Sequence, residues 1–286
     1  MEKLIFSNEN GSVELGLKAP FILQTVDGIG NLTARRRTQQ SPFQHGTTQI
    51  ASYFNERDIG LTFTGLASSE ADIIQLRRQV QKLFNPLIES TLTYIRGDYS
   101  KEIKCYAAST PKNISSEKTS FRQQFVVTLI CNDPFWLDIE HSGEVMSFSI
   151  ANFGFELEIE EEGVEFEVEG TNRTVIYNDG DIETPIEIIF EGPASNPKII
   201  NETTGEYIQV DAILGNNEKL IINTEFGNKQ VIFDDGTTQI NAFNLVTIDS
   251  TFWSLVQGEN FVSYTADSGI DVANVTINYR NRYIGL

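Results

Sequence analysis

The sequence has few of the residues on which many enzymes and metal sites depend. Only two cysteines, Cys105 and Cys131, and two histidines, His45 and His141, occur among its 286 residues. Neither cysteine has a second cysteine or a histidine at metal-ligand spacing, which argues against a disulfide framework and a structural zinc site. We expect both thiols to be free. Without a Gly-x-Ser-x-Gly motif or a glycine-rich phosphate loop, the sequence indicates neither a hydrolase of the Ser-His type nor a nucleotide site. We predict no catalytic residue, cofactor or metal.

Long hydrophobic runs are also absent. No stretch of 18 consecutive apolar residues occurs, which argues against a membrane-spanning helix. The first ten residues contain at most three apolar residues in succession, so a secretory signal peptide is not indicated. We therefore expect a soluble protein that is made in the cytoplasm and does not bind membranes.

Positive charge is scarce, and its distribution is uneven. The 21 Lys and Arg residues stand against 40 Asp and Glu residues, a net charge of −19. This balance argues against non-specific nucleic-acid binding, which depends on basic side chains that displace counterions. Residues 1–140 contain 15 basic and 15 acidic side chains, whereas residues 141–286 contain 6 and 25. The entire excess of negative charge therefore belongs to the second half of the chain.

The pattern of apolar residues predicts mainly β structure with one helix. Only residues 69–84 show a helical period, and Ser69 with Asp72 resembles a capping box at the start of that helix. Pro86 follows the segment and ends it. The apolar positions of this helix form one stripe, made of Ile73, Leu76, Val80, Leu83 and Phe84. The first half is therefore predicted to be an α+β domain, with one helix packed on β-sheets.

A long polar stretch, residues 31–48, separates the early strands from the helix. Loops of this length are uncommon inside a compact domain and often make contacts with other molecules, so we expect an extended arm here. The arm contains the only cluster of basic residues in the chain. The residues that we predict to form an interface are Arg35, Arg36, Arg37, Gln39 and Gln40 in the arm, with Arg77 and Arg78 on the helix. Contact with protein is favoured. The alternatives are contact with phosphate and a strand face that is only exposed to solvent.

A domain boundary is predicted near residues 134–142. The strand before it ends at Asn132-Asp133-Pro134, because proline cannot donate to a β-ladder, and the charge changes at the same place. The predicted domains are residues 1–138 and 139–286. Beyond the boundary no helical period occurs, and Phe155–Glu160 and Val164–Glu169 alternate apolar residues with glutamate. Together with turns spaced about ten residues apart, this predicts an antiparallel β-sandwich.

Three further features of the sequence could indicate a chemical function, but each also has a structural explanation. Acidic pairs in the second half could serve a glycosidase, but 25 acidic residues produce such pairs by chance. Asp179–Glu183 and Asp234-Asp235-Gly236 could offer oxygen ligands to calcium, although Asp-Gly is ordinary turn chemistry. Trp136 and Trp253 each follow a phenylalanine and could stack on sugar, but core packing is the commoner role. We predict that the chain is not an enzyme.

Several short motifs, in order along nearly the whole chain, resemble the siphophage distal tail protein family. In the first half these are Glu56-Arg57-Asp58-Ile59, Leu83-Phe84-Asn85-Pro86, Thr91-Leu92-Thr93-Tyr94 and Cys131-Asn132-Asp133-Pro134-Phe135-Trp136. In the second half they are Asn178–Asp181, Thr184–Ile186, Glu191-Gly192, Ile199–Asn201, Lys219–Thr224, Phe252–Asn260 and Arg282–Leu286.

The resemblance implies a structural virion protein at the tip of the phage tail. It implies a hexameric ring formed by the first domains, and a galectin-like sandwich as the second. The implied partners are further copies of the chain, the major tail tube protein, the tail-associated lysin or tail fibre protein, and a receptor-binding protein. Nucleic acid would only pass through the ring channel. The alternative is a carbohydrate-binding sandwich that adsorbs to the host cell wall, with Trp253 as a contact to sugar.

Overall fold

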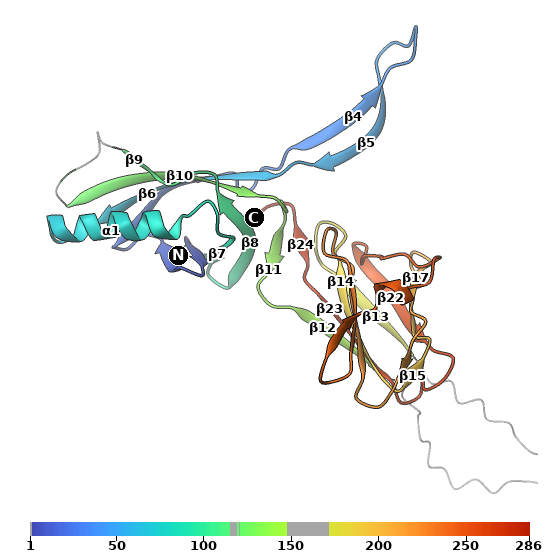
Figure 1. Cartoon of the computed structure of the whole chain (residues 1–286). Helices are drawn as coiled ribbons and strands as arrows, with labels where there is room; N and C mark the ends of the chain where they lie inside the picture. The colour runs from blue at the N-terminus through green and yellow to red at the C-terminus, as the bar shows by residue number, and fades with distance from the viewer. Residues whose placement is uncertain (1, 115–118, 120, 148–171) are drawn as a thin grey trace, which may run out of the picture. The chain divides into compact units, whose positions relative to one another are not determined.

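The computed structural model describes residues 2–114, 119, 121–147 and 172–286, which form two compact units. Unit 1 comprises Met1–Ile139 and Arg282–Leu286, and unit 2 comprises Glu140–Asn281. The prediction of a mainly β chain is confirmed, and α1 (Glu70–Leu83) is the one α-helix among the described residues (Figure 1). The last five residues return to unit 1, whereas the boundary drawn from sequence assigned everything after residue 138 to the second domain. Charge and proline placement carry no information about such a return.

Unit 1 is built on one antiparallel sheet, with strands in the order β2-β1-β7-β8-β10-β6-β3. Gly16 forms a parallel bridge to Ile22, so the chain just after β2 pairs with the chain in β3 and brings the two ends of the sheet together. The strands are β1 (Glu2–Asn8), β2 (Gly11–Leu15), β3 (Phe21–Asp27), β6 (Arg57–Leu66), β7 (Ser90–Arg96), β8 (Tyr99–Ala107) and β10 (Arg122–Cys131). Three short strands extend it, namely β9 (Lys112–Ile114) on β10, β11 (Trp136–Asp138) on β8, and β24 (Arg282–Tyr283) on β11.

Helix α1 covers the core of unit 1, as its sequence predicts. The Ser69 hydroxyl accepts a hydrogen bond from the Asp72 backbone N–H at 3.1 Å, which caps the first turn. All five residues of the predicted apolar stripe are buried or half-buried. Phe84, the C-cap residue, stacks on Phe6 with ring centroids 4.1 Å apart. Phe63 of β6 stacks on Phe84 and on Phe125 of β10, so helix and sheet share one aromatic core.

The core of unit 1 also contains both cysteines. Cys105 on β8 and Cys131 on β10 are fully buried and free, as expected. The Cys105 thiol lies against the Cys131 thiol, and this contact together with burial raises the pKa of Cys105. Neither thiol is exposed to reagents in solution while the fold is intact.

Unit 2 contains two antiparallel sheets with a shared core. The first has the order β12-β23-β14-β19-β20-β21 and the second β13-β22-β16-β17, and buried apolar side chains of both belong to one cluster. The strands of the first sheet are β12 (Ser142–Ser147), β14 (Ile186–Glu191), β19 (Lys219–Asn223), β20 (Gln230–Asp234), β21 (Gln239–Asn241) and β23 (Asn274–Tyr279). Those of the second are β13 (Arg173–Asn178), β16 (Lys198–Asn201), β17 (Glu206–Gln209) and β22 (Gly258–Thr265). Short pieces β15 (Ala194–Ser195), β18 (Ile213–Leu214) and η1 (Phe243–Leu245) complete the unit. The alternating segments 155–160 and 164–169 lie outside the described residues.

Candidate interaction surfaces

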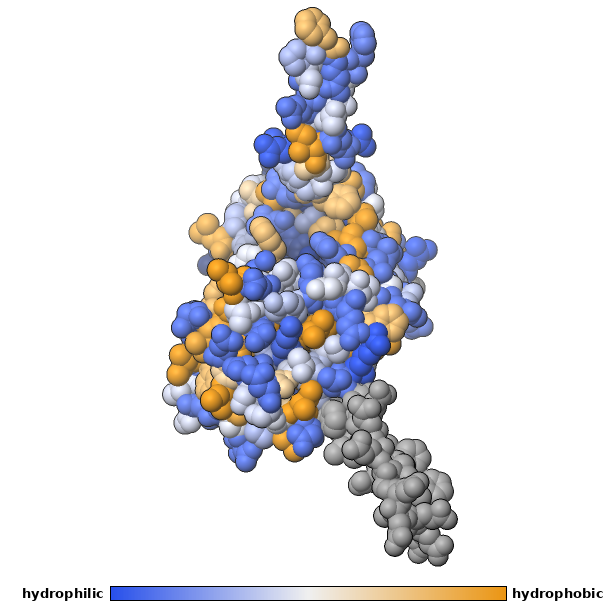
Figure 2. Space-filling model, turned by 90° about the vertical axis from the view of Figure 1, so that its right-hand side faces the viewer, coloured by the Kyte–Doolittle hydropathy of each residue, from blue (hydrophilic) through white to orange (hydrophobic). Residues whose placement is uncertain are grey.

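The arm predicted over residues 31–48 is a two-stranded hairpin and reaches further along the chain. Its strands are β4 (Ala34–Gln39) and β5 (Thr48–Phe54), and every residue of both strands is exposed. Within the part of the chain that the structure describes, they pair only with each other, with an irregularity in register between Arg37 and Thr38. Figure 1 shows this hairpin projecting from the rest of unit 1, and Figure 2 shows it as a narrow, mostly hydrophilic projection. An isolated two-stranded hairpin is marginally stable in water. A second surface that covers it would add the missing stability.

Three arginines of the arm line up along β4. In the register of the hairpin, Arg35 lies opposite Tyr53, Arg36 opposite Ser52 and Arg37 opposite Ala51. Because side chains alternate along a strand, Arg35 and Arg37 point to one face and Arg36 to the other. The arm therefore presents positive charge on both faces.

The tip of the arm is a tight turn with an exposed aromatic residue. Phe43 has a φ of 66°, a backbone conformation that is rare for a residue with a side chain, and its ring is fully exposed. The turn is closed by hydrogen bonds between the backbone and two glutamines, from Gln40 Nε2 to the Gln44 carbonyl at 3.1 Å and from the Ser41 N–H to Gln44 Oε1 at 3.0 Å. Gln40 thus shapes the tip, whereas Gln39 ends β4 with its side chain exposed.

The helix arginines do not join the arm. Arg77 is half-buried and Arg78 is exposed on α1. Figure 1 shows the helix and the arm at opposite ends of unit 1. The residues predicted as one interface therefore form two separate groups.

The base of the arm contains a buried arginine that sequence reasoning did not single out as a site. Arg57, the first residue of β6, is 2% exposed and lies on the same side of the strand as Ile59, Leu61 and Phe63. Its guanidinium donates only to backbone carbonyls: Nε to Pro134 at 2.7 Å, Nη1 to three carbonyls at 2.8–3.2 Å, and Nη2 to Ile284. The three carbonyls bound by Nη1 belong to Gly28, Ile29 and Asn31.

Burial lowers the pKa of the Arg57 guanidinium from its ordinary value, although an arginine retains its charge in proteins. The sequence did contain a signal for this site, because the alternation of β6 places residue 57 on the buried face. A buried position occupied by arginine predicts a polar network.

A second buried cation lies near the end of unit 1. Lys101 on β8 is 8% exposed, and its amino group contacts the Asp138 carboxylate and lies 3.9 Å from the centre of the Tyr283 ring. Burial alone would lower the pKa of Lys101, but the hydrogen bonds to Asp138 and Tyr283 outweigh it and the pKa is raised. The cation and the aromatic ring hold β8, β11 and β24 together.

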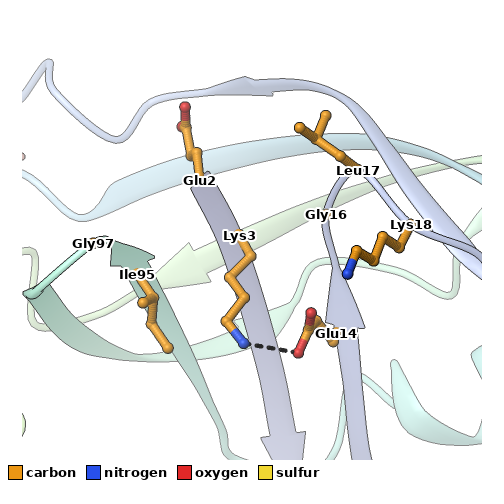
Figure 3. A pocket seen from close by; sticks show the side chains of 8 residues that line it. All are labelled: Glu2, Lys3, Glu14, Gly16, Leu17, Lys18, Ile95 and Gly97. Carbon is orange, nitrogen blue, oxygen red and sulfur yellow. Dashed lines mark hydrogen bonds and ion pairs between the residues drawn. The ribbon is translucent and has the colours of Figure 1, made fainter.

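Two of the hollows in the described structure are shallow and lie on the surface of one unit each. One, of about 340 Å³, lies in unit 1 between the ends of β1, β2 and β7 (Figure 3), where Lys3 pairs with Glu14 at 3.0 Å and Leu17 is 68% exposed. The other, of about 320 Å³, lies in unit 2 along β20 and β21 and includes the half-exposed Phe243. Both are open, and neither gathers a set of acid, base and nucleophile. Neither therefore has the character of an active site.

The residues that the sequence left open as contacts to sugar or calcium have structural roles in the fold. Trp136 and Trp253 are buried, so Trp253 does not provide a surface on which sugar could stack, and the core-packing explanation is correct. Asp235 accepts hydrogen bonds from the backbone N–H groups of Thr237 and Thr238, which lowers its pKa to about 2. Among the described residues, no three His, Cys, Asp or Glu side chains are grouped closely enough to hold a metal ion. In that same part of the chain, no helix has the length and apolar character needed to cross a bilayer.

Comparison with known families matches both halves of the chain to phage tail components. Residues 8–131 match the model of the phage tail protein RIFT-related domain, and residues 179–283 match that of the siphovirus-type tail component, C-terminal domain. No curated protein sequence matches the chain.

Solved structures share the fold over nearly the whole length. One is the Dit (gp 19.1) protein of phage SPP1, which is described as a paradigm of the hub adsorption apparatus in phages that infect Gram-positive bacteria. Its sequence is 12% identical to this chain, the TM-score is 0.69, and 98% of each chain is covered. Chains of the phage p2 baseplate in its activated conformation with Sr and with Ca are 11% and 12% identical, with TM-scores of 0.56 and 0.54 and full coverage of both chains. The two family models occur in succession along one chain. The first lies on unit 1, and the second lies on unit 2 and continues into Arg282 and Tyr283 of unit 1. The chain belongs to the siphophage distal tail protein family.

Proposed function

We propose that this structural protein of a phage tail or baseplate forms a homohexameric ring at the distal end of a siphophage tail. In this proposal unit 1 forms the ring, and unit 2 is a galectin-like domain at its outside. The ring connects the major tail tube protein to the tail-associated lysin or tail fibre protein and to a receptor-binding protein. The protein is synthesised in the host cytoplasm, resides at the tip of the virion tail, has no enzymatic activity, and contacts nucleic acid only as DNA passes through the ring.

The arm carries this proposal. Its thirteen strand residues are all exposed, which leaves a hairpin of marginal stability without a covering surface. A neighbouring copy that covers the arm satisfies this requirement in every protomer of a closed ring. The contacts would be made by Arg35–Arg37, Gln39 and Gln40, and Arg77 and Arg78 would form a second contact on α1.

The charge distribution also supports a ring formed by unit 1. Residues 1–140 have equal numbers of acidic and basic side chains, so copies of this part repel one another little. Residues 141–286 carry the whole net charge of −19, and several copies of that part favour separation. Low salt should therefore weaken contacts between second units more than contacts between first units.

Sedimentation velocity of the full chain, at low and physiological salt, tests the proposal. We expect the wild-type chain to sediment as a hexamer, alone or after addition of tail tube protein. Replacement of Arg35–Arg37 by glutamate should prevent assembly, because it reverses the charge on both faces of the arm. A matched control replaces three exposed lysines of unit 1, Lys82, Lys104 and Lys112, by glutamate and should still assemble. A wild-type chain that stays monomeric at high concentration and does not bind tube protein contradicts the proposal.

The residue that the carbohydrate-binding alternative named as a contact to sugar is buried. Trp253 is 1% exposed and belongs to the core of unit 2, so it cannot stack on a sugar ring. The tail-ring function is therefore the one that we propose.

A further inference from the structure

The C-terminal segment, Arg282–Leu286, occupies a binding site on unit 1 although all of unit 2 precedes it in the chain. Its strand β24 pairs antiparallel with β11, with Tyr283 opposite Trp136. Arg282 Nη2 contacts Asp133 Oδ2 at 3.1 Å, and the Tyr283 hydroxyl donates to Asp138 Oδ2 at 3.4 Å. Backbone pairing, an ion pair and a half-buried ring thus bind this segment to unit 1.

The same segment contacts the base of the arm through Arg57. The arm base consists of residues 28–33, which enter β4, and residues 55–57, which leave β5. Arg57 belongs to one strand of this base, donates to three carbonyls of the other through Nη1, and donates through Nη2 to the carbonyl of Ile284. One guanidinium therefore joins both strands of the arm base to the C-terminal segment. Its fixed, planar arrangement of donors resists movement of any of these partners alone.

A second contact joins the segment to the arm base without any side chain. A Cβ atom on Gly285 would lie 2.9 Å from the Gly30 carbonyl oxygen and 3.2 Å from Gly30 Cα. Both are backbone atoms, so the loop at residues 28–31 could accept the Cβ only by moving. Gly30 is a contrasting position in the same contact, because a Cβ built on it meets nothing within 4 Å.

We propose that the C-terminal segment acts as a latch that fixes the base of the arm. Unit 2 is inserted between β11 and β24, so the segment reaches its site only when the chain has been made through unit 2. Until then Arg57 lacks one of its carbonyl partners and the loop at residues 28–31 lacks its packing partner. The arm is therefore fixed for contact with a second copy only in a chain that has been made through residues 282–286. This last consequence rests on the function proposed above, whereas the latch itself does not.

Hydrogen exchange of the full-length chain tests the latch. The reporter is the arm base, where the Asn55 N–H donates to the Thr33 carbonyl at 2.9 Å. In a Gly285→Ala chain we expect amides at residues 28–33 and 55–57 to exchange at least tenfold faster than in wild type. Gly30→Ala is the matched control and should change these rates less than twofold. Arg57→Lys is a second perturbation, since a single amino group cannot reach all the carbonyls that the guanidinium joins, and it should also accelerate exchange there.

The possible results distinguish the proposal of the latch from the proposal of the ring. Faster exchange at the arm base in Gly285→Ala, with unit 2 amides unchanged, supports the latch. Unchanged exchange at the arm base in both Gly285→Ala and Arg57→Lys overturns it, whatever the state of assembly. If exchange responds but the wild-type chain remains a monomer with tube protein present, the latch is supported and the proposed ring is contradicted. If the ring forms and Gly285→Ala also weakens it, both are supported.

Discussion

Replacement of Arg57 by methionine should strongly destabilise unit 1. Methionine retains much of the side-chain volume but has no hydrogen-bond donor. The five carbonyls that accept from the guanidinium therefore each lose that hydrogen bond. The Ile29 carbonyl also accepts from Trp136 Nε1 at 3.1 Å and keeps that partner. The others, at Gly28, Asn31, Pro134 and Ile284, lose a charged donor.

The expected loss follows from the cost of a buried acceptor without a partner, about 1–3 kcal/mol for each group. Three of them, at Gly28, Asn31 and Pro134, set an upper range near 3–9 kcal/mol. Water can enter at the edge of the arm base and rehydrate some of them, and removing a buried charge recovers its desolvation cost. We therefore expect unit 1 to lose about 3–5 kcal/mol in Arg57→Met. Arg57→Lys, which keeps the charge and some donors, should lose less.

Denaturation monitored by tryptophan fluorescence measures this loss. One tryptophan lies in each unit, so a Trp253→Phe background leaves Trp136 as the reporter of unit 1. That background change costs little hydrogen bonding, because Trp253 Nε1 is buried without a partner among the described residues. The three chains to compare are the background, Arg57→Met and Arg57→Lys, in urea. A loss below about 1 kcal/mol in Arg57→Met would refute the reasoning, because it would equal one ordinary hydrogen bond.

Other predictions concern the core, one turn and the thiols. Phe63→Ala, which removes the ring stacked between Phe84 and Phe125, should destabilise unit 1 by about 3–5 kcal/mol in the same urea assay, and a loss under about 1 kcal/mol would contradict the packing described. The pKa of Asp235 is depressed in the folded state, so its turn contributes stability above pH 3.8 that is lost as the pH falls towards about 2. NMR titration of the carboxyl group should give a midpoint below 3.8, and a midpoint at or above that value would contradict the turn geometry. Cys105 and Cys131 should react with a thiol reagent only on unfolding, and rapid reaction of the native chain would contradict their burial.

Local patterns predicted the elements that a short stretch of sequence specifies. The helix is an example, because an apolar stripe and a capping serine specify both its face and its first residue before any tertiary contact is known. The arm is another, since a polar segment too long for a turn must extend from a compact domain. Its extent was underestimated, because the prediction ended the arm at residue 48, whereas its second strand runs over Thr48–Phe54 and contains apolar residues. All of them remain exposed.

The predicted interface shows the limit of such patterns. The arginines of the arm and of α1 were grouped by charge, yet the fold places them at opposite ends of unit 1 (Figure 1). Charge clusters in sequence report composition, whereas proximity depends on the path of the chain. The same limit applies to Trp253, for which sequence left core packing and sugar contact both open and burial decided between them.

By itself, the sequence determined that this protein is a mainly β chain in two parts of unequal charge, with one helix, one arm and the motifs of a tail component. Only the tertiary structure decided that the last five residues return to unit 1 and meet Arg57 at the base of the arm. The physical reason is that hydrophobic period, caps and turns act over a few residues. The contact between Arg57 and Ile284 joins positions far apart in the chain, and only the assembled sheet brings them together.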